Sequence, residues 1–338
     1  MIRILAALTI LTLPTALAAQ DDAAIVEDVV NSHILPRFEM LAERSDHLAD
    51  IAQETCEATA PPLRTAYGEA FDAWVAASHL RFGPTEQDDR AFALAFWPDS
   101  RGATPKRLAE LIADQDPIAD TAEEYADVSI AARGFYALEF LLYDPAISTM
   151  GDATYRCQLV RTVTQDIAAT TASISRDWHE DYAARMLNPA PDGTYRSENE
   201  VLRELFKSLT TGLEFTADTR LSRPMGSFDR PRPTRAEAWR SGRSARHVEL
   251  SLDALNDLAI RMAGEGTDLA SEFNTAFAYS QTRLARLDNP TFAGVSSAQG
   301  RLRIEVIEQG VQAIRTLARD ELGPRLGVAA GFNSMDGD

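Results

Sequence analysis

Hydrophobic positions recur at three- and four-residue steps along most of the chain, the spacing of amphipathic helices. Ala, Leu, Glu, Arg and Asp dominate these segments, and the alternation typical of β-strands is hard to find. The pattern predicts an all-α fold, with long helices over residues 22–55, 60–80, 119–143, 154–186, 197–220, 234–263, 267–287 and 296–321.

Proline and glycine separate these segments. Pro61-Pro62 opens the second predicted helix, where proline is tolerated because the first turn leaves its N–H groups unpaired. Residues 83–105 form a long irregular connection, and such connections are often functional. Residues 188–193, reading NPAPDG, cannot continue a helix. We therefore expect two packed four-helix-type bundles, one over residues 19–188 and one over 195–325.

The first 18 residues have the features of a signal peptide. Arg3 supplies a positive charge, residues 4–13 form an apolar run, and Ala16-Leu17-Ala18 matches the small-x-small cleavage pattern. The run is much shorter than the roughly 20 apolar residues of a membrane span. A buried core helix is the alternative. We expect an exported, soluble protein in the bacterial periplasm, with no membrane span in the mature chain.

Charge and cysteine content narrow the picture further. The formal charge of −18 repels nucleic acid and anionic lipid, so nucleic-acid binding is set aside. Only two cysteines exist, Cys56 and Cys157, and no third residue gives them metal-site spacing. In an exported chain such a pair indicates one disulfide, and two buried free thiols are the alternative.

Glu139 is the most unusual ionisable residue. It lies in the run 135–143, reading FYALEFLLY, which is otherwise almost wholly apolar. A helix that is apolar all round is buried, and a buried carboxylate needs a partner, a metal ion or a proton. Tyr136 is three residues before it on the same face. Gly134 indicates close approach of another element or a ligand. A structural Glu–Arg pair is the alternative.

Several motifs resemble those of imelysin-like proteins. Residues 134–142 resemble the family's Gly-x-His-x-x-Glu signature. The other similar regions are Phe71-x-x-Trp74, 81–84, 96–99 and 239–244, so that the motifs fall in order across both halves of the chain. The resemblance implies two helical bundles with a cleft between them near the signature helix. It also implies a role in iron acquisition, with envelope iron-uptake components or a metal ligand as partners, or a metal-dependent peptidase activity.

One departure from the signature changes the chemistry that we expect. Tyr136 stands where the signature has histidine, so Gly134 and Glu139 are the matching positions. A zinc peptidase needs about three protein ligands, usually rich in histidine, and no His-Glu-x-x-His run exists. A Tyr136–Glu139 pair suits ferric iron or another hard cation better. We expect a metal-binding or chelate-binding protein rather than an active peptidase. A structural envelope adaptor without a ligand is a third possibility.

The remaining candidates are basic. Residues 220–246 hold eight arginines and only two acids, Asp229 and Glu237. Arg240 and Arg243 follow helical spacing and are candidate ligand-binding residues, because guanidinium groups bind carboxylates and phosphates at two points. The alternative is that these arginines pair with the acidic first half. The five histidines are interpreted as surface or capping residues rather than ligands. His79 is the exception that could belong to a site, because it precedes residues 81–84.

Overall fold

The computed structural model describes residues 22–328, and this part of the chain is helical. It contains no β-strand, and its one β-bridge joins Ser227 to Arg230. The predicted all-α fold is therefore confirmed. The predicted signal peptide, residues 1–18, lies outside the described residues. No helix within residues 22–328 is long and apolar enough to cross a membrane.

The first part of the chain forms nine α-helices: α1 (Asp22–Val29), α2 (Leu35–Glu54), α3 (Pro61–Ala77), α4 (Arg90–Leu94), α5 (Ala103–Asp114), α6 (Ala122–Tyr125), α7 (Gly134–Tyr143), α8 (Ala153–Asp177) and α9 (Ala183–Leu187). The second part forms six more: α10 (Glu198–Glu214), α11 (Ser222–Met225), α12 (Ser244–Ala263), α13 (Asp268–Leu284), α14 (Ala298–Leu317) and α15 (Gly323–Arg325). Four π-helical segments interrupt or extend them: Val30–Ile34, Trp178–Tyr182, Phe215–Leu221 and Ala318–Leu322.

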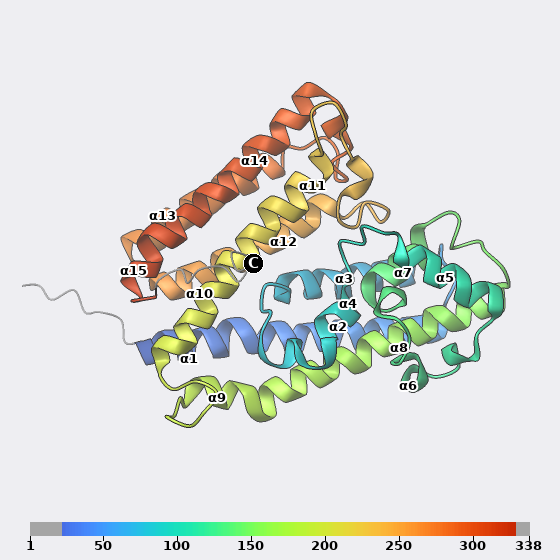
Figure 1. Cartoon of the computed structure of the whole chain (residues 1–338), viewed down its shortest axis with the longest axis horizontal. Helices are drawn as coiled ribbons and strands as arrows, with labels where there is room; N and C mark the ends of the chain where they lie inside the picture. Colours follow the sequence, from blue (N-terminus) through green and yellow to red (C-terminus); the bar gives the residue numbers. More distant parts are fainter. Residues whose placement is uncertain (1–21, 329–338) are drawn as a thin grey trace, which may run out of the picture.

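These helices gather into two groups (Figure 1). In the first, α2 packs along both α3 and α8, and α7 packs on α8. In the second, α13 packs between α12 and α14, and α10 contacts both α12 and α14. The groups meet where α12 contacts α3, and α1 also packs on α10 and α12. The loop between α9 and α10 contains the predicted domain boundary at residues 188–195.

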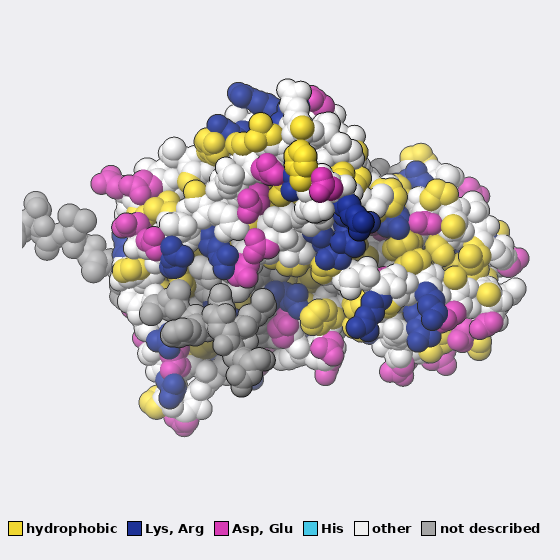
Figure 2. Space-filling view, turned by 45° about the horizontal axis from the view of Figure 1, so that its top comes forward, with side chains coloured by type: hydrophobic (Ala, Val, Ile, Leu, Met, Phe, Trp, Pro, Cys, Tyr) yellow, Lys and Arg dark blue, Asp and Glu magenta, His cyan; other side chains and the backbone are white. Residues whose placement is uncertain are grey.

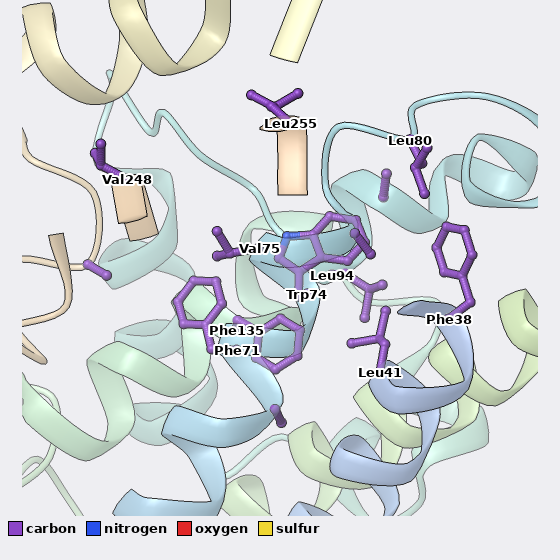
Figure 3. Close-up of a cluster of buried hydrophobic side chains, with 14 of the residues drawn as sticks. Phe38, Leu41, Phe71, Trp74, Val75, Leu80, Leu94, Phe135, Val248 and Leu255 are labelled. Atoms are coloured by element: carbon purple, nitrogen blue, oxygen red, sulfur yellow. The ribbon is translucent and has the colours of Figure 1, made fainter. Parts of the chain in front are cut away.

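A buried hydrophobic cluster joins the groups (Figure 3). Phe71 and Trp74 of α3 are buried, and the Phe71 ring stacks on that of Phe135 at 4.8 Å between centroids. Val248 and Leu255 of α12 approach the same cluster from the second group and are fully buried. Burial of a side chain of this size contributes about 1.5–3 kcal/mol, so the contact between the groups is part of the core.

Cys56 and Cys157 form a disulfide, as predicted, with Cα atoms 5.0 Å apart. The bond ties the segment that follows α2 to the first turns of α8. The two cysteines are 101 residues apart in the sequence. Closing a loop of this length stabilises the folded protein by up to about 4.7 kcal/mol, because it lowers the chain entropy of the unfolded state.

Three helix predictions were wrong in detail. The predicted helix 119–143 is broken, because Arg133 is extended and Gly134 has a φ of +73° at the start of α7. Residues 103–114 form α5 after Gly102 turns the chain with a left-handed conformation, although the sequence predicted no helix there and placed residues 103–105 in the irregular connection 83–105. The predicted helix 234–263 begins only at Ser244. The preceding residues form turns, and the alternation of basic and apolar residues there imitates a helical pattern.

Acidic and basic side chains are interspersed on the face shown in Figure 2, although the chain as a whole is acidic. Within residues 22–328 as a whole, many basic groups are held in ion pairs with carboxylates, such as Arg261 with Asp28 and Arg315 with Glu214. The acidic balance of the chain therefore does not produce a uniform negative surface on this face.

Candidate ligand-binding site between the two groups of helices

A cavity of about 270 Å³ lies where the two groups meet. The first group lines it from α3, α4, α7 and the segments after α3 and α4. The second lines it from α10, the π-segment Phe215–Leu221 and residue 237. Much of its wall is aromatic: Trp74, Phe92, Trp97, Tyr136 and Phe215. A dry void of about 150 Å³ can hold one benzene ring, so this cavity admits a small organic molecule.

A buried polar network forms one wall of the cavity. The Tyr136 hydroxyl of α7 donates a 2.5 Å hydrogen bond to Glu237 Oε1, which belongs to the second group. Arg220 Nε donates to Glu237 Oε2 at 2.6 Å, and its Nη1 donates to Ser251 at 3.1 Å. Each of the three network side chains is at most 6% exposed. Arg220 lies in a π-helical segment, an irregularity frequent at functional sites.

The charges of this network are fixed by its surroundings. Burial, reinforced by the Glu237 charge, raises the pKa of Tyr136 well above its usual value, so the phenol keeps its proton. Burial alone would also raise the pKa of Glu237, but the charge and hydrogen bond of Arg220, together with the neighbouring His247, outweigh this effect and hold this pKa well below its ordinary value. The wall is therefore a neutral phenol that donates to an ionised carboxylate paired with a guanidinium.

Glu139 has a different environment, one turn further along α7. It is 2% exposed, and its Oε1 accepts hydrogen bonds from the Ser241 N–H at 2.9 Å and the Ser241 hydroxyl at 2.8 Å. Within residues 22–328 it forms no ion pair, so the predicted alternative of a direct Glu139–Arg pair is not what the structure contains. Burial raises the pKa of Glu139, and the Ser241 hydrogen bonds only partly oppose this.

Two buried groups near the carboxylates lack hydrogen bonds. His247 of α12 is fully buried, and neither ring nitrogen is hydrogen-bonded within the described residues. Its Nδ1 lies 3.3 Å from Glu237 Oε2, close enough for an electrostatic contact. The buried Tyr67 hydroxyl also has no hydrogen-bond partner in this part of the chain. Unsatisfied buried polar groups are costly, so their clustering beside Glu139 and Glu237 is typical of a functional site.

Gly134 acts through the backbone. With φ at +73°, it starts α7, and a Cβ at this position would collide with the carbonyl oxygens of Ala93 and Leu94 at the end of α4. The sequence expectation of close approach by another element is therefore met. Gly134 allows α4 to pack against the start of α7 and so positions Tyr136 near Phe92 and Ala95 in the cavity wall.

The predicted arginines join the two groups of helices. Arg240 Nε donates to Asp144 Oδ2 at 2.8 Å, and its guanidinium lies 3.8 Å above the Phe140 ring centre. Arg243 and Arg246 both pair with Asp72 of α3. These contacts match the alternative in which the basic segment pairs with acids of the first half. Neither Arg240 nor Arg243 lines the cavity.

The interpretation of the histidines as surface or capping residues was wrong for three of them. His33 and His247 are fully buried and His79 is 6% exposed. His33 Nε2 lies 2.8 Å from His79 Nε2, although 46 residues separate them in sequence. Single-sequence spacing cannot reveal this pair, because it forms only when the π-segment Val30–Ile34 and the segment that follows α3 come together in the fold.

The predicted metal ligands do not form a ready site for a bare cation. Tyr136 donates to Glu237, whereas Glu139 accepts from Ser241, so the two oxygens are engaged by different partners. Within residues 22–328 no three His, Cys, Asp or Glu side chains form a group that could hold a metal ion. Binding of a bare ion to Tyr136 would require the loss of a proton that its surroundings retain.

Sequence reasoning missed Arg220, Glu237 and Ser241 as site residues. Glu237 carried a signal: it is one of only two acids among the eight arginines of residues 220–246. A lone acid in a basic segment is a candidate partner for a buried arginine. Ser241 lies in the region 239–244 that resembles the family, but its role was not evident, because that role depends on a turn that places its N–H and hydroxyl on Glu139.

The geometry defines an all-helical protein with a largely aromatic cavity between two helical groups, one wall of which is a buried polar network, and comparison identifies its family. The imelysin family model matches residues 34–319, so the chain belongs to the imelysin family. No curated protein matches it. The expected resemblance to the imelysin-like proteins is therefore confirmed.

Two solved structures share the fold. An imelysin-like protein from Psychrobacter arcticum 273-4 is 23% identical, with a TM-score of 0.79, and the match covers 93% of this chain and 98% of that one. A proposed iron-regulated protein A precursor from Parabacteroides distasonis ATCC 8503 is 14% identical, with a TM-score of 0.74, covering 90% and 94% of the two chains. At these identities the likeness concerns the fold.

Proposed function

We propose that this protein binds a small ligand, specifically a chelated metal ion, in the cavity between the two helical groups as part of iron acquisition. The Tyr136–Glu237–Arg220 network in the cavity wall carries the proposal. A buried, preorganised polar network beside aromatic side chains is the usual composition of a small-molecule site. The name of one structural neighbour, which refers to iron regulation, adds support.

The chemistry of the wall favours a chelate over a bare ion. Both oxygens of Glu237 accept hydrogen bonds, one from Tyr136 and one from Arg220. A bare cation would have to displace one of these donors, whereas an organic chelate brings its own ligand atoms and can stack on Trp97 or Phe215. Aromatic and cationic groups together suit a planar chelator that carries negative charge.

The location supports the same function. The Cys56–Cys157 disulfide is typical of proteins outside the cytoplasm. Together with the signal-peptide pattern of residues 1–18, it supports export to the periplasm, where metal complexes taken up by the cell are handled. Envelope components of iron uptake are the partners that this location offers.

A second groove, between α13 and α14, lacks the chemistry that would suggest a different binding function. It has a volume of about 590 Å³. Small and apolar residues dominate its lining, with Glu272 and Tyr279 as its ionisable groups. It has no buried charge network comparable to that of Glu237, so the chemistry favours the cavity at the junction.

The proposal is tested on protein purified from its native envelope without chelators, by native mass spectrometry and metal analysis. We expect an organic mass together with a stoichiometric metal. Thr211→Trp, which places a bulky ring at an exposed position of the cavity lining, should abolish both. Arg203→Trp, exposed on the same helix but outside the lining, is the matched control and should retain both. Metal without an organic mass, or equal loading of both variants, would contradict the proposal.

A further inference from the structure

A chain of hydrogen bonds runs from the side of the molecule into the cavity. Asp257 Oδ2 of α12 lies 2.8 Å from His33 Nδ1. His33 Nε2 in turn lies 2.8 Å from His79 Nε2, and His79 lines the cavity. The network at Tyr136 does not use these residues. Three elements distant in sequence, α12, the π-segment Val30–Ile34 and the segment that follows α3, are thus connected.

The protons of this chain follow from the geometry. Asp257 also accepts from Arg37 and Arg261, and the His33 hydrogen bond and these charges lower its pKa to about 2 against the effect of burial. The carboxylate is therefore ionised and can only accept, so His33 Nδ1 carries a proton. Burial lowers the pKa of His33 to about 4, so the ring is neutral and its Nε2 has a free lone pair.

The same reasoning assigns the proton position of the His79 ring. Its Nε2 must donate to the lone pair of His33 Nε2, because the two atoms are within hydrogen-bond distance. Burial, with the nearby charges of Arg37 and Arg220, lowers the pKa of His79 well below its usual value, so this ring is neutral as well. A neutral ring with its proton on Nε2 has an unprotonated Nδ1. No hydrogen bond to this Nδ1 is found within residues 22–328.

The surroundings hold this arrangement in place. Arg37 donates to the His33 carbonyl at 2.8 Å and to Asp257 Oδ2 at 2.9 Å, so one guanidinium fixes both ends of the first link. Arg261 bridges Asp257 to Asp28 of α1. The charged groups that face the histidine pair are therefore Asp257, Arg37 and Arg261 on one side and Arg220 on the cavity side. A ring nitrogen whose partner is oriented by further hydrogen bonds is typical of a preorganised site.

We propose that His79 is a ligand-contacting residue of the cavity, held as a hydrogen-bond acceptor by His33 and Asp257, and that it selects ligands bearing a hydroxyl group. The inference rests on the proposed function, because it names the class of molecule that the cavity takes. His33 and Asp257 are positioning residues. Glu237 already engages the Tyr136 hydroxyl and Arg220 Nε as hydrogen-bond donors. A hydroxyl group on a ligand needs an acceptor, and the unprotonated Nδ1 of His79 supplies it.

The proton positions are tested first, without any ligand. Long-range ¹H–¹⁵N spectra of the histidine rings distinguish protonated from unprotonated nitrogens. At pH 7 we expect the proton of His79 on Nε2 and that of His33 on Nδ1. Asp257→Asn should disturb both tautomers, whereas Asp253→Asn, on the same helix one turn earlier and hydrogen-bonded to Gln281, should leave them unchanged. A proton on Nδ1 of His79 in the wild-type protein would overturn the inference.

Ligand selection is tested with phenol and anisole, a probe pair that differs in the hydroxyl donor. A site that hydrogen-bonds a hydroxyl rejects the analogue without it, so phenol should bind about tenfold or more tightly than anisole and shift the His79 Nδ1 resonance. His79→Leu should remove the preference. Asp257→Asn should weaken it while leaving the cavity lining intact, which keeps the test valid if His79→Leu does not fold.

Equal affinity for phenol and anisole, or no binding of either, would contradict the assigned ligand class. These outcomes are separate from those of the native-envelope experiment, in which a retained chelate can be found whether or not His79 contacts a hydroxyl. Conversely, phenol selection by His79 in a protein that carries no metal would leave this inference standing and remove the iron role.

Discussion

The Tyr136 hydroxyl donates a 2.5 Å hydrogen bond to Glu237 across the junction of the two helical groups. Tyr136 belongs to α7, and 101 residues separate it from Glu237 in the sequence. The Tyr136 hydroxyl therefore has a defined partner: it satisfies one oxygen of a buried carboxylate whose other oxygen binds Arg220. The hydrogen bond links the signature helix to the second group and places both residues on the cavity wall.

Removal of this hydrogen bond should destabilise the protein. Tyr136→Phe deletes the donor and leaves a buried carboxylate oxygen unsatisfied, so we expect a loss of about 1.5–3 kcal/mol in the free energy of unfolding. Urea denaturation followed by circular dichroism measures it. Tyr143→Phe is the control, because Tyr143 is half-buried and contacts Arg64 through its ring, and it should change stability by less than about 0.5 kcal/mol. Equal effects of the two changes would show that the Glu237 contact is unimportant.

The Arg220–Glu237 pair should show strong coupling. Both side chains are 4% exposed, and deletion of one partner strands the other charge, so Arg220→Met and Glu237→Gln should each cost about 3–5 kcal/mol. The double variant should lose clearly less than the sum of the single losses. The exposed pair Arg107–Glu110 is the control, with an expected coupling below about 1 kcal/mol. Additive losses at Arg220 and Glu237 would mean that the two side chains act independently.

The buried histidine pair should make stability depend on pH. The pKa of His33 is lowered from 6.5 to about 4 by burial, so between these values the unfolded chain binds a proton that the folded protein excludes. The contribution of neutral His33 is complete above pH 6.5 and is lost as the pH falls toward 4. The free energy of unfolding should drop by about 2 kcal/mol between pH 7.5 and pH 5 from this residue alone.

His33→Gln isolates this effect, because glutamine does not titrate. The variant should lose stability at pH 7.5 but show a shallower fall toward pH 5, whereas the exposed His47→Gln should keep the wild-type slope. Asp257 is ionised in both states over this range and does not confound the comparison. An unchanged slope in His33→Gln would show that the ring is protonated in the folded protein.

The sequence predicted the helical class and the disulfide because both depend on local or compositional signals. Helical periodicity is present within each segment, and two cysteines in a chain with a signal-peptide pattern leave few alternatives. The break at Gly134 was missed because glycine is tolerated inside helical patterns, and only the packing of the Ala93 and Leu94 carbonyls forces its positive φ.

The candidate site was only partly predictable for a related reason. Tyr136 and Glu139 lie on one turn of one helix, so the apolar run around them revealed both. Their partners Glu237 and Ser241 belong to the second group and come close only through tertiary packing. Likewise, His33 and His79 share no sequence motif. A single sequence does not record which distant residues become neighbours, so this pair could not be predicted.

Glu139 and Glu237 should respond differently to the loss of their charge. Glu139 accepts hydrogen bonds from Ser241 and has no ion-pair partner in the described residues, and burial raises its pKa. A carboxyl whose pKa is raised by folding destabilises the folded state increasingly as the pH rises above its unfolded value of 4.5. Glutamine keeps an oxygen for Ser241 without the buried charge. Glu139→Gln should therefore be neutral or stabilising at pH 7, within about 1 kcal/mol, and the gain should shrink toward pH 4.5.

Thermal and urea unfolding of Glu139→Gln and Glu237→Gln, measured side by side, decide this. Glu237→Gln strands Arg220 and should lose about 3–5 kcal/mol, so the two isosteric changes should differ by several kcal/mol although both carboxylates are buried. If Glu139→Gln loses as much as Glu237→Gln, Glu139 is a structural charge. If it keeps its stability but purifies from the native envelope without metal, Glu139 supports cargo binding through Ser241 and the signature helix, because Glu139 itself does not line the cavity.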